Sequence, residues 1–176
     1  MIKTLLLLIA VAVAALLLYA STRPDTFAVE RSTTIAAPPE ELFPLIDDLQ
    51  AFNTWNPYAR KDPAMKASYS GPVAGAGAAF DFHGNKDVGR GRIAVTGSTA
   101  PSEVRMQLDM FEPFEGHNTV VFSLVPEGAG TKVTWAMHGP SAFITKLMGI
   151  FFNMDQMIGK DFEAGLANLR QLAEKD

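Results

Sequence analysis

The chain has 176 residues and a formal net charge of −4, and 48% of its residues are hydrophobic. This length suits one domain of ordinary size with an appendage. No long basic run is present, so the sequence lacks the electrostatic footprint of a nucleic-acid-binding protein. The sequence also has no cysteine, which excludes thiol catalysis, disulfides and thiolate metal sites.

Residues 1–20 predict a membrane segment. Leu5–Ala20 has no charged residue, and with its uncharged neighbours it approaches the roughly 20 residues that span a bilayer. We interpret it as a transmembrane anchor or an uncleaved signal. A signal peptide cut after Ala20 is the alternative, but Leu18 stands where a small residue is preferred, and the apolar run is long for a signal peptide.

The charges that flank this segment predict its orientation. Lys3 and the free amino group favour a cytoplasmic N-terminus. The protein would then be single-pass, with its soluble domain on the extracytoplasmic, or periplasmic, side of the membrane. Arg23 and Arg31 favour the reverse, so a cytoplasm-facing domain is the alternative.

A polar linker over residues 21–26 leads into a predicted domain over residues 27–176. Phe27–Ile35 alternates apolar and polar side chains, as a strand does. Pro39 and the two glutamates after it mark the start of a helix. Glu40–Leu49 then places its apolar residues on one helical face, which predicts a helix packed on a core.

The middle of the chain predicts an antiparallel sheet with one apolar face. Ser102–Phe111 is the clearest strand, because its apolar residues alternate with polar ones. The turn Glu127–Gly130 is typical of a hairpin. Consecutive, short-linked strands of this kind indicate a sheet with one buried and one wet side. The other predicted strands are Lys66–Ser70, Ala78–His83, Arg90–Gly97, Asn118–Val125 and Thr131–His138.

The C-terminal segment predicts a long helix. In Asn153–Glu174 the apolar residues recur at steps of three and four, which gives one apolar stripe. Gly159 and Gly165 interrupt it, although glycine costs about 1 kcal/mol relative to alanine inside a helix. We therefore expect both glycines where the helix comes close to the sheet or to a ligand. A shorter helical region begins near Ala142 and should bend or break near Asn153.

The predicted order is a strand, a helix pair, six antiparallel strands and a long C-terminal helix, and it resembles the START-like, or SRPBCC, superfamily. That superfamily includes lipid-transfer domains and polyketide cyclase/dehydrases. The resemblance implies an α+β helix-grip fold, in which a curved antiparallel sheet wraps around the C-terminal helix and two short helices follow the first strand. It also implies an apolar cavity between sheet and helix, but no catalytic signature. The stretches that carry it are Val29–Pro57, Ala74–Asn85, Gly128–Gly139 and Asp155–Glu174.

Alternation and the resemblance together predict an apolar ligand-binding wall. Trp55 and Tyr58 lie in Phe52–Tyr58, a predicted loop or short helical turn that resembles a cavity entrance, and their polar groups could orient a ligand. Methionines suit such a wall because thioethers adapt to irregular partners. Ordinary core packing is the alternative for each residue. The predicted wall comprises Phe80, Phe82, Met106, Met110, Phe122, Trp135 and Met137 from strands and Met148, Phe151, Phe152, Met154, Met157 and Phe162 from helices.

Three functions follow as hypotheses. The favoured one is membrane-tethered binding of a hydrophobic small molecule or lipid in this cavity, with no cofactor and no nucleic-acid partner. The second is a polyketide cyclase/dehydrase-like enzyme, although the predicted wall nearly lacks the positioned acid or base that such chemistry needs. The third is a ligand-free interaction or stress-protection module with a filled core.

Overall fold

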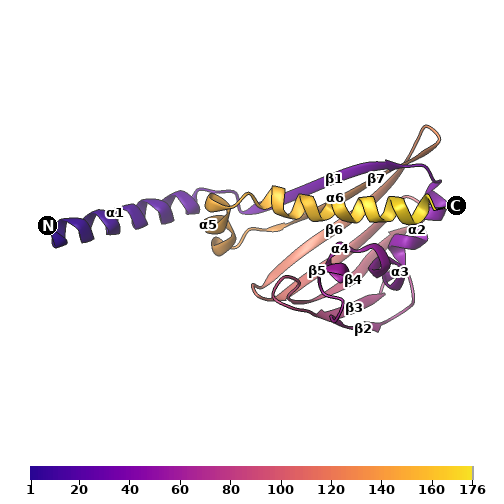
Figure 1. Cartoon of the computed structure of the whole chain (residues 1–176), viewed down its shortest axis with the longest axis horizontal. Coiled ribbons are helices and arrows are strands. Elements are labelled where there is room, and N and C mark those ends of the chain that lie inside the picture. The colour runs from indigo at the N-terminus through magenta and orange to yellow at the C-terminus, as the bar shows by residue number, and fades with distance from the viewer. Residues whose placement is uncertain (176) are drawn as a thin grey trace.

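The computed structural model describes residues 1–175. One helix, α1 (Ile2–Ser21), projects away from a domain in which a curved sheet holds the C-terminal helix (Figure 1). The elements that follow are β1 (Thr26–Ile35), α2 (Pro39–Asp47), α3 (Leu49–Trp55), α4 (Pro57–Lys61), β2 (Lys66–Ser70), β3 (Ala79–His83), β4 (Arg90–Thr99), β5 (Glu103–Glu112), β6 (Gly116–Glu127), β7 (Gly130–Pro140), α5 (Phe143–Phe151) and α6 (Met154–Ala173). This architecture confirms the predicted α+β helix-grip fold.

The seven strands form one antiparallel sheet in the order β1-β7-β6-β5-β4-β3-β2. Strands β2 to β7 form a meander, and β1 pairs with β7 from Thr26 opposite Pro140 to Ile35 opposite Thr131. The amide of Ser141 continues this contact by donating to the Asp25 carbonyl at 2.7 Å. The residues that follow α1 therefore lie beside those that precede α5.

The strand register decides which side chains face the helix. Phe122 lies opposite both Val104 and Trp135, so these three share one face of the sheet. Two residues before Phe122 in β6, Val120 lies opposite both Met106 and Met137 in the same way. All of these side chains are buried. The alternation predicted for β5 to β7 is thus the alternation between the core and the wet face.

Helix α6 begins where the sequence predicts, because the Asn153 side chain accepts a hydrogen bond from the Gln156 amide at 3.0 Å and caps the first turn. The helix runs along the sheet and packs chiefly on β1, as Figure 1 shows. Its buried face confirms the middle of the predicted stripe and also contains both glycines, whereas Met157 and Leu172 of the stripe are exposed. That face consists of Gly159, Phe162, Gly165, Leu166 and Leu169.

The region in which we expected two short helices contains three. Asp48 is extended and accepts from the Gln50 amide at 2.7 Å, so it ends α2 and caps α3. Asn56 does the same for α4, accepting from the Tyr58 amide at 3.1 Å. The segment Phe52–Tyr58, predicted to be a loop or a short helical turn, is therefore the end of one capped helix and the start of another.

Helix α1 is long and apolar enough to cross a membrane, and only 6% of its most apolar 18-residue stretch is buried. It is therefore not a core helix of the domain. Its far end packs against α5, and Ala20 is its one buried residue. The candidate anchor thus joins the domain at the end of the sheet where α5 and the start of α6 lie (Figure 1).

Candidate functional site

Most of the predicted ligand wall is packed core. Trp55 and Phe122 have no exposed surface, and Trp135 is only 4% exposed. Met110, Met154 and Tyr58 are half-buried, and Phe151 and Met157 are exposed. The remaining predicted wall residues from the strands and α6 are buried: Phe80, Phe82, Met106, Met137 and Phe162. Ligand contact by any of these side chains stays a prediction.

Aromatic rings fill the space between the middle of α6 and the sheet. Phe162 of α6 stacks on Trp135 of β7 with ring centroids 4.2 Å apart and planes 9° apart. Phe122 lies 4.9 Å and Trp55 5.8 Å from the same indole. The Trp55 Nε1 donates to the Leu45 carbonyl at 2.7 Å, which fixes that side chain inside the core rather than at an entrance.

Trp135 carries an unsatisfied polar atom. Its Nε1 is buried and has no hydrogen-bond partner within residues 1–175. An unpaired buried donor costs about 1–3 kcal/mol. Asp47, at the end of α2, has one buried carboxylate oxygen in the same situation. The sequence did not single out either atom, because both depend on packing between distant segments.

Polar contacts hold α4 against α6. Lys61 binds Asp161 at 2.7 Å, and its Nζ lies 4.9 Å from the Tyr58 ring centroid. Asn168 accepts from Arg60 at 2.7 Å and donates to the Trp55 carbonyl at 3.0 Å. Burial, and then the Asp161 carboxylate, raise the pKa of the Tyr58 phenol above its ordinary value.

A large open groove lies at the end of the domain that carries α1. It has a volume of about 620 Å³ and runs between the linker, the start of β1, α5 and the first turns of α6. Three predicted wall residues line it, namely Phe151, Phe152 and Met154. The other lining residues are Arg23, Pro24, Thr26, Phe27, Ser141, Thr145, Lys146, Gly149, Ile150, Asn153, Asp155 and Ile158.

Ion pairs neutralise most of the charges around this groove. Lys146 of α5 pairs with Asp25 of the linker, and only 10% of the Lys146 side chain is exposed. Asp155 pairs with Arg31 at 2.9 Å, and this contact lowers the pKa of the Asp155 carboxyl. Arg23 lies over the Tyr19 ring at 5.9 Å. No carboxylate within residues 1–175 forms an ion pair with Arg23, so the rim keeps one uncompensated positive charge.

The groove residues that the prediction missed come from two distant parts of the chain. Pairing of β1 with β7 brings residues 23–27 beside residues 141–158. The apolar spacing of Ile150 and Ile158 was visible in the sequence, but it fits any buried helix face. No local signal distinguishes Arg23 or Gly149 as groove residues.

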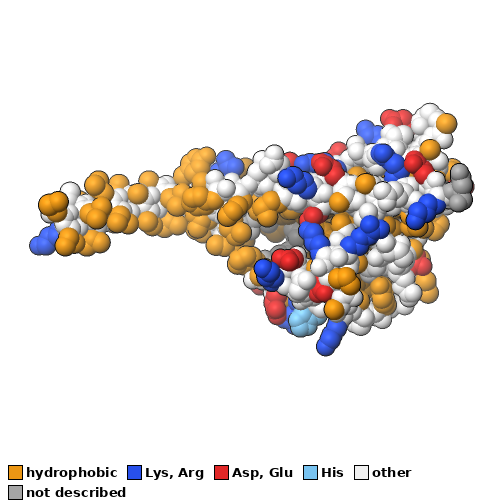
Figure 2. Space-filling model, in the orientation of Figure 1, with side chains coloured by type: hydrophobic (Ala, Val, Ile, Leu, Met, Phe, Trp, Pro, Cys, Tyr) orange, Lys and Arg blue, Asp and Glu red, His pale blue; other side chains and the backbone are white. Residues whose placement is uncertain are grey.

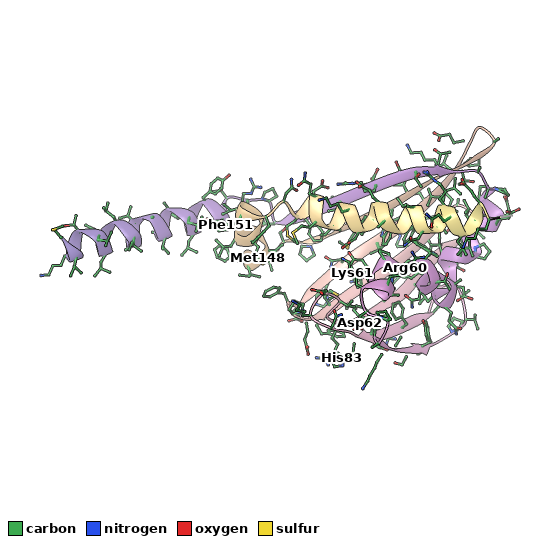
Figure 3. The ribbon with its side chains drawn as sticks, in the orientation of Figure 1. Arg60, Lys61, Asp62, His83, Met148 and Phe151 are labelled. Atoms are coloured by element: carbon green, nitrogen blue, oxygen red, sulfur yellow. The ribbon has the colours of Figure 1, made fainter. Side chains whose placement is uncertain are left out.

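The surface is also hollowed beside this groove. Figure 2 shows the depression between α5 and the end of α4. In the same view Lys61 and Asp62 lie across it from Met148 of α5 (Figure 3). The depression is thus apolar on its α5 side and charged on its α4 side.

A curved sheet that grips a C-terminal helix defines the START-like, or SRPBCC, class, which confirms the resemblance stated for the sequence. The family model described as polyketide cyclase / dehydrase and lipid transport matches residues 26–174. The chain belongs to this family, which supports a ligand-binding domain. Comparison with curated proteins gave no match.

Solved structures share the fold at low sequence identity. A protein from Chromobacterium violaceum superimposes with a TM-score of 0.60 at 16% identity, over 88% of this chain and 100% of its own. A protein from Rhizobium leguminosarum gives 0.62 at 12% identity, over 86% and 96%. DynU16, from the dynemicin biosynthetic locus, gives 0.60 at 14% identity, over 87% and 48%. At these identities the similarity shows the fold alone.

Proposed function

We propose that this protein is a membrane-anchored binding protein for a hydrophobic or amphiphilic small molecule such as a lipid. The observation that carries the proposal is the groove of about 620 Å³ between β1, α5 and the start of α6. Its volume falls within the range of about 300–1,000 Å³ typical of small-molecule sites. Seven apolar residues and seven polar or charged residues line it together with Gly149, and such a lining suits an amphiphilic ligand.

The proposed ligand lies at the end of the grip rather than at its centre. The stacked rings of Trp135 and Phe162 leave the centre filled. The groove instead offers Phe27, Ile158 and Met154 on walls that meet at an open mouth. The ligand would thus lie between the sheet edge and the C-terminal helix, beside the end of α1.

The proposed anchor is α1. Its 20 residues correspond to about 30 Å of helix, which matches the hydrocarbon thickness of a bilayer. Lys3 at its start supports the orientation with the domain outside the cytoplasm. The intact mass of the purified protein tests this step, because retention of residues 1–20 is required of an anchor and a mass lacking them identifies a cleaved signal.

Photo-crosslinking tests the ligand site. The full chain in lipid nanodiscs is illuminated with an alkyl carboxylic acid that bears a diazirine, and the modified peptides are mapped by mass spectrometry. We expect labelling within residues 141–158. Labelling confined to α1, or spread evenly over the domain surface, contradicts the proposed site.

A matched pair of variants sharpens this test. A Cβ at Gly149 would have no atom within 4 Å, so Gly149→Phe begins in open space, adds bulk to the groove and should reduce labelling several-fold. Ala164→Phe adds the same bulk to an exposed face of α6 outside the groove and should leave labelling unchanged. Equal labelling in both variants would falsify the groove as the binding site.

A ligand-free interaction module is the second candidate, and the filled aromatic centre favours it. Trp55 and Phe162 both pack against the Trp135 ring there. Native mass spectrometry of the full chain separates the two candidates. A bound lipid that Gly149→Phe removes supports the binding protein, whereas the bare mass of both wild type and variant supports the module.

A further inference from the structure

We propose that α5 is a membrane-surface helix, whose apolar face lies in the bilayer beside the end of α1. This inference rests on the proposed anchor and goes beyond ligand binding. It assigns a docking surface on the domain itself and names its partner, the lipid interface around α1. The groove would then open at the bilayer surface.

The exposed surface of α5 is almost entirely apolar. No residue of the helix is buried, although it contains six large apolar side chains in nine positions. Phe143 is 48% exposed, Ile144 42% and Phe151 63%. Phe152, just past the helix, is 53% exposed. A continuous patch of this kind on a protein surface marks an interaction site.

Helical spacing sorts the side chains of α5 onto two faces. Thr145, Lys146 and Gly149 fall on the face that lines the groove. The opposite face consists of Phe143, Ile144, Leu147 and Met148. Phe151, the last residue of the helix, falls on this face by its spacing but also lines the groove. Figure 3 shows Met148 and Phe151 on the end of the domain that carries α1. The helix therefore presents an exposed apolar face at the end of the domain that carries α1.

The one charge of α5 is withdrawn from that face. Lys146 is its single charged residue, and the Lys146 ammonium is paired with the Asp25 carboxylate. The Lys146 side chain is 10% exposed, so the helix presents no free charge to its surroundings. For a helix that contacts lipid, this arrangement avoids the cost of an unpaired charge in the membrane.

Position identifies the bilayer as the partner. The end of α1 packs directly against α5, so whatever surrounds the last turn of α1 also reaches α5. Tyr19, half exposed at that turn, lies under the Arg23 guanidinium, and aromatic and basic side chains are typical of the membrane–water interface. Amphipathic helices bind there with aromatic and aliphatic side chains in the acyl boundary. The patch is thus continuous with the proposed transmembrane segment (Figure 2).

Site-directed fluorescence tests this inference. The chain contains no cysteine, so one introduced cysteine labels one site. Ile144→Cys and Phe151→Cys report on α5 in the full chain in phosphatidylcholine liposomes. Leu7→Cys inside α1 is the membrane reference, and Ala129→Cys, in the exposed β6–β7 turn, is the aqueous reference. Each bears an environment-sensitive dye, and quenching by lipids spin-labelled near the headgroup is compared with quenching by iodide.

We expect both α5 labels to be quenched several-fold more by the spin-labelled lipid than the Ala129 label, and less by iodide. Quenching of the Leu7 label by lipid, with α5 labels that behave like Ala129, overturns the inference and leaves the anchor standing. A Leu7 label that lipid does not quench overturns both. Labels on α5 that neither quencher reaches identify a protein partner or a second copy instead, and also overturn the inference.

Discussion

The backbone of Gly165 lies against the indole of Trp135. A Cβ at Gly165 would lie 2.6 Å from Cζ3 of that ring and 3.0 Å from Cδ of Pro57. Gly159, two turns earlier, has the guanidinium of Arg31 in the corresponding place. At both glycines α6 therefore comes close to its surroundings, as the sequence led us to expect, but the neighbours of the two glycines differ in how far they can move.

That difference predicts unequal effects of alanine at the two sites. In Gly165→Ala the new methyl group meets two buried rings, and overpacking of this kind costs about 1–3 kcal/mol. The gain of about 1 kcal/mol in helix propensity offsets part of this loss. Chemical denaturation should therefore show a lower free energy of unfolding, by up to about 2 kcal/mol.

Gly159→Ala is the matched control. Its methyl group displaces only the end of Arg31, which can swing toward solvent and leave Asp155 and Glu163. Exposed ion pairs contribute little to stability, and the helix gains propensity, so the net change should be near zero. A larger loss for Gly159→Ala than for Gly165→Ala would contradict the packing described here.

The Tyr58 phenol should lose its proton at a higher pH than an exposed tyrosine does. Burial is the main cause that raises its pKa above the ordinary 10.0, and the Asp161 carboxylate adds to it. The folded state therefore keeps the phenol neutral where the unfolded chain ionises it, and stability should fall as pH rises above about 10. The difference in tyrosinate absorbance between wild type and Tyr58→Phe isolates this group.

Asp161→Asn provides the control for Tyr58. It removes the charge but not the burial, so the midpoint should fall only part of the way toward 10.0. A Tyr58 midpoint already at the ordinary value in the wild type would show that α4 does not stay packed against α6.

Local patterns predicted most of the fold. Alternation placed the β5 strand within one residue of its observed bounds, Glu103–Glu112, and the polar residue Asn153 marked the start of α6. These signals work because side-chain period and capping are properties of neighbouring residues. The third short helix was missed because Asn56 looked like part of an aromatic loop, and its capping role depends on the backbone bend at that residue.

The site was less predictable because it depends on distant contacts. The local sequence around Trp55 fits a core position and a rim position equally well. The hydrogen bond from its Nε1 to the Leu45 carbonyl places it in the core. Lys146 meets Asp25 across 121 residues, and Arg31 meets Asp155 across 124. Such pairs follow from which strand neighbours β1, and no short stretch of sequence encodes that choice.

The pair formed by His117 and Asp109 predicts a pH dependence on the wet face of the sheet. His117 Nδ1 lies 2.7 Å from Asp109 Oδ1, and this contact raises the pKa of His117 above 6.5 and lowers that of Asp109 below 3.8. The histidine contribution is therefore fully present below about 6.5 and is lost as pH rises through the higher folded pKa. The aspartate contribution is lost as pH falls through its lowered folded pKa.

Asp109→Asn tests that pair. In an NMR titration the His117 midpoint should lie above 6.5 in the wild type and fall in the variant. The thermal midpoints of the two proteins should differ more in mildly acidic buffer than in alkaline buffer, where His117 is neutral in both states. Identical His117 midpoints in the two proteins would mean that the contact does not persist in solution.

Arg23 should give the groove a preference for anionic ligands. It is the rim cation left without an ion pair in the described chain, whereas Lys146 and Asp155 are neutralised by Asp25 and Arg31. An exposed ion pair contributes about 0–1 kcal/mol, which corresponds to at most about fivefold in affinity. A photoreactive fatty acid should therefore label the groove up to about fivefold more strongly than the matching fatty alcohol.

Arg23→Gln should remove that preference and leave labelling by the alcohol unchanged. An equal preference for the acid in wild type and variant would place the headgroup away from Arg23.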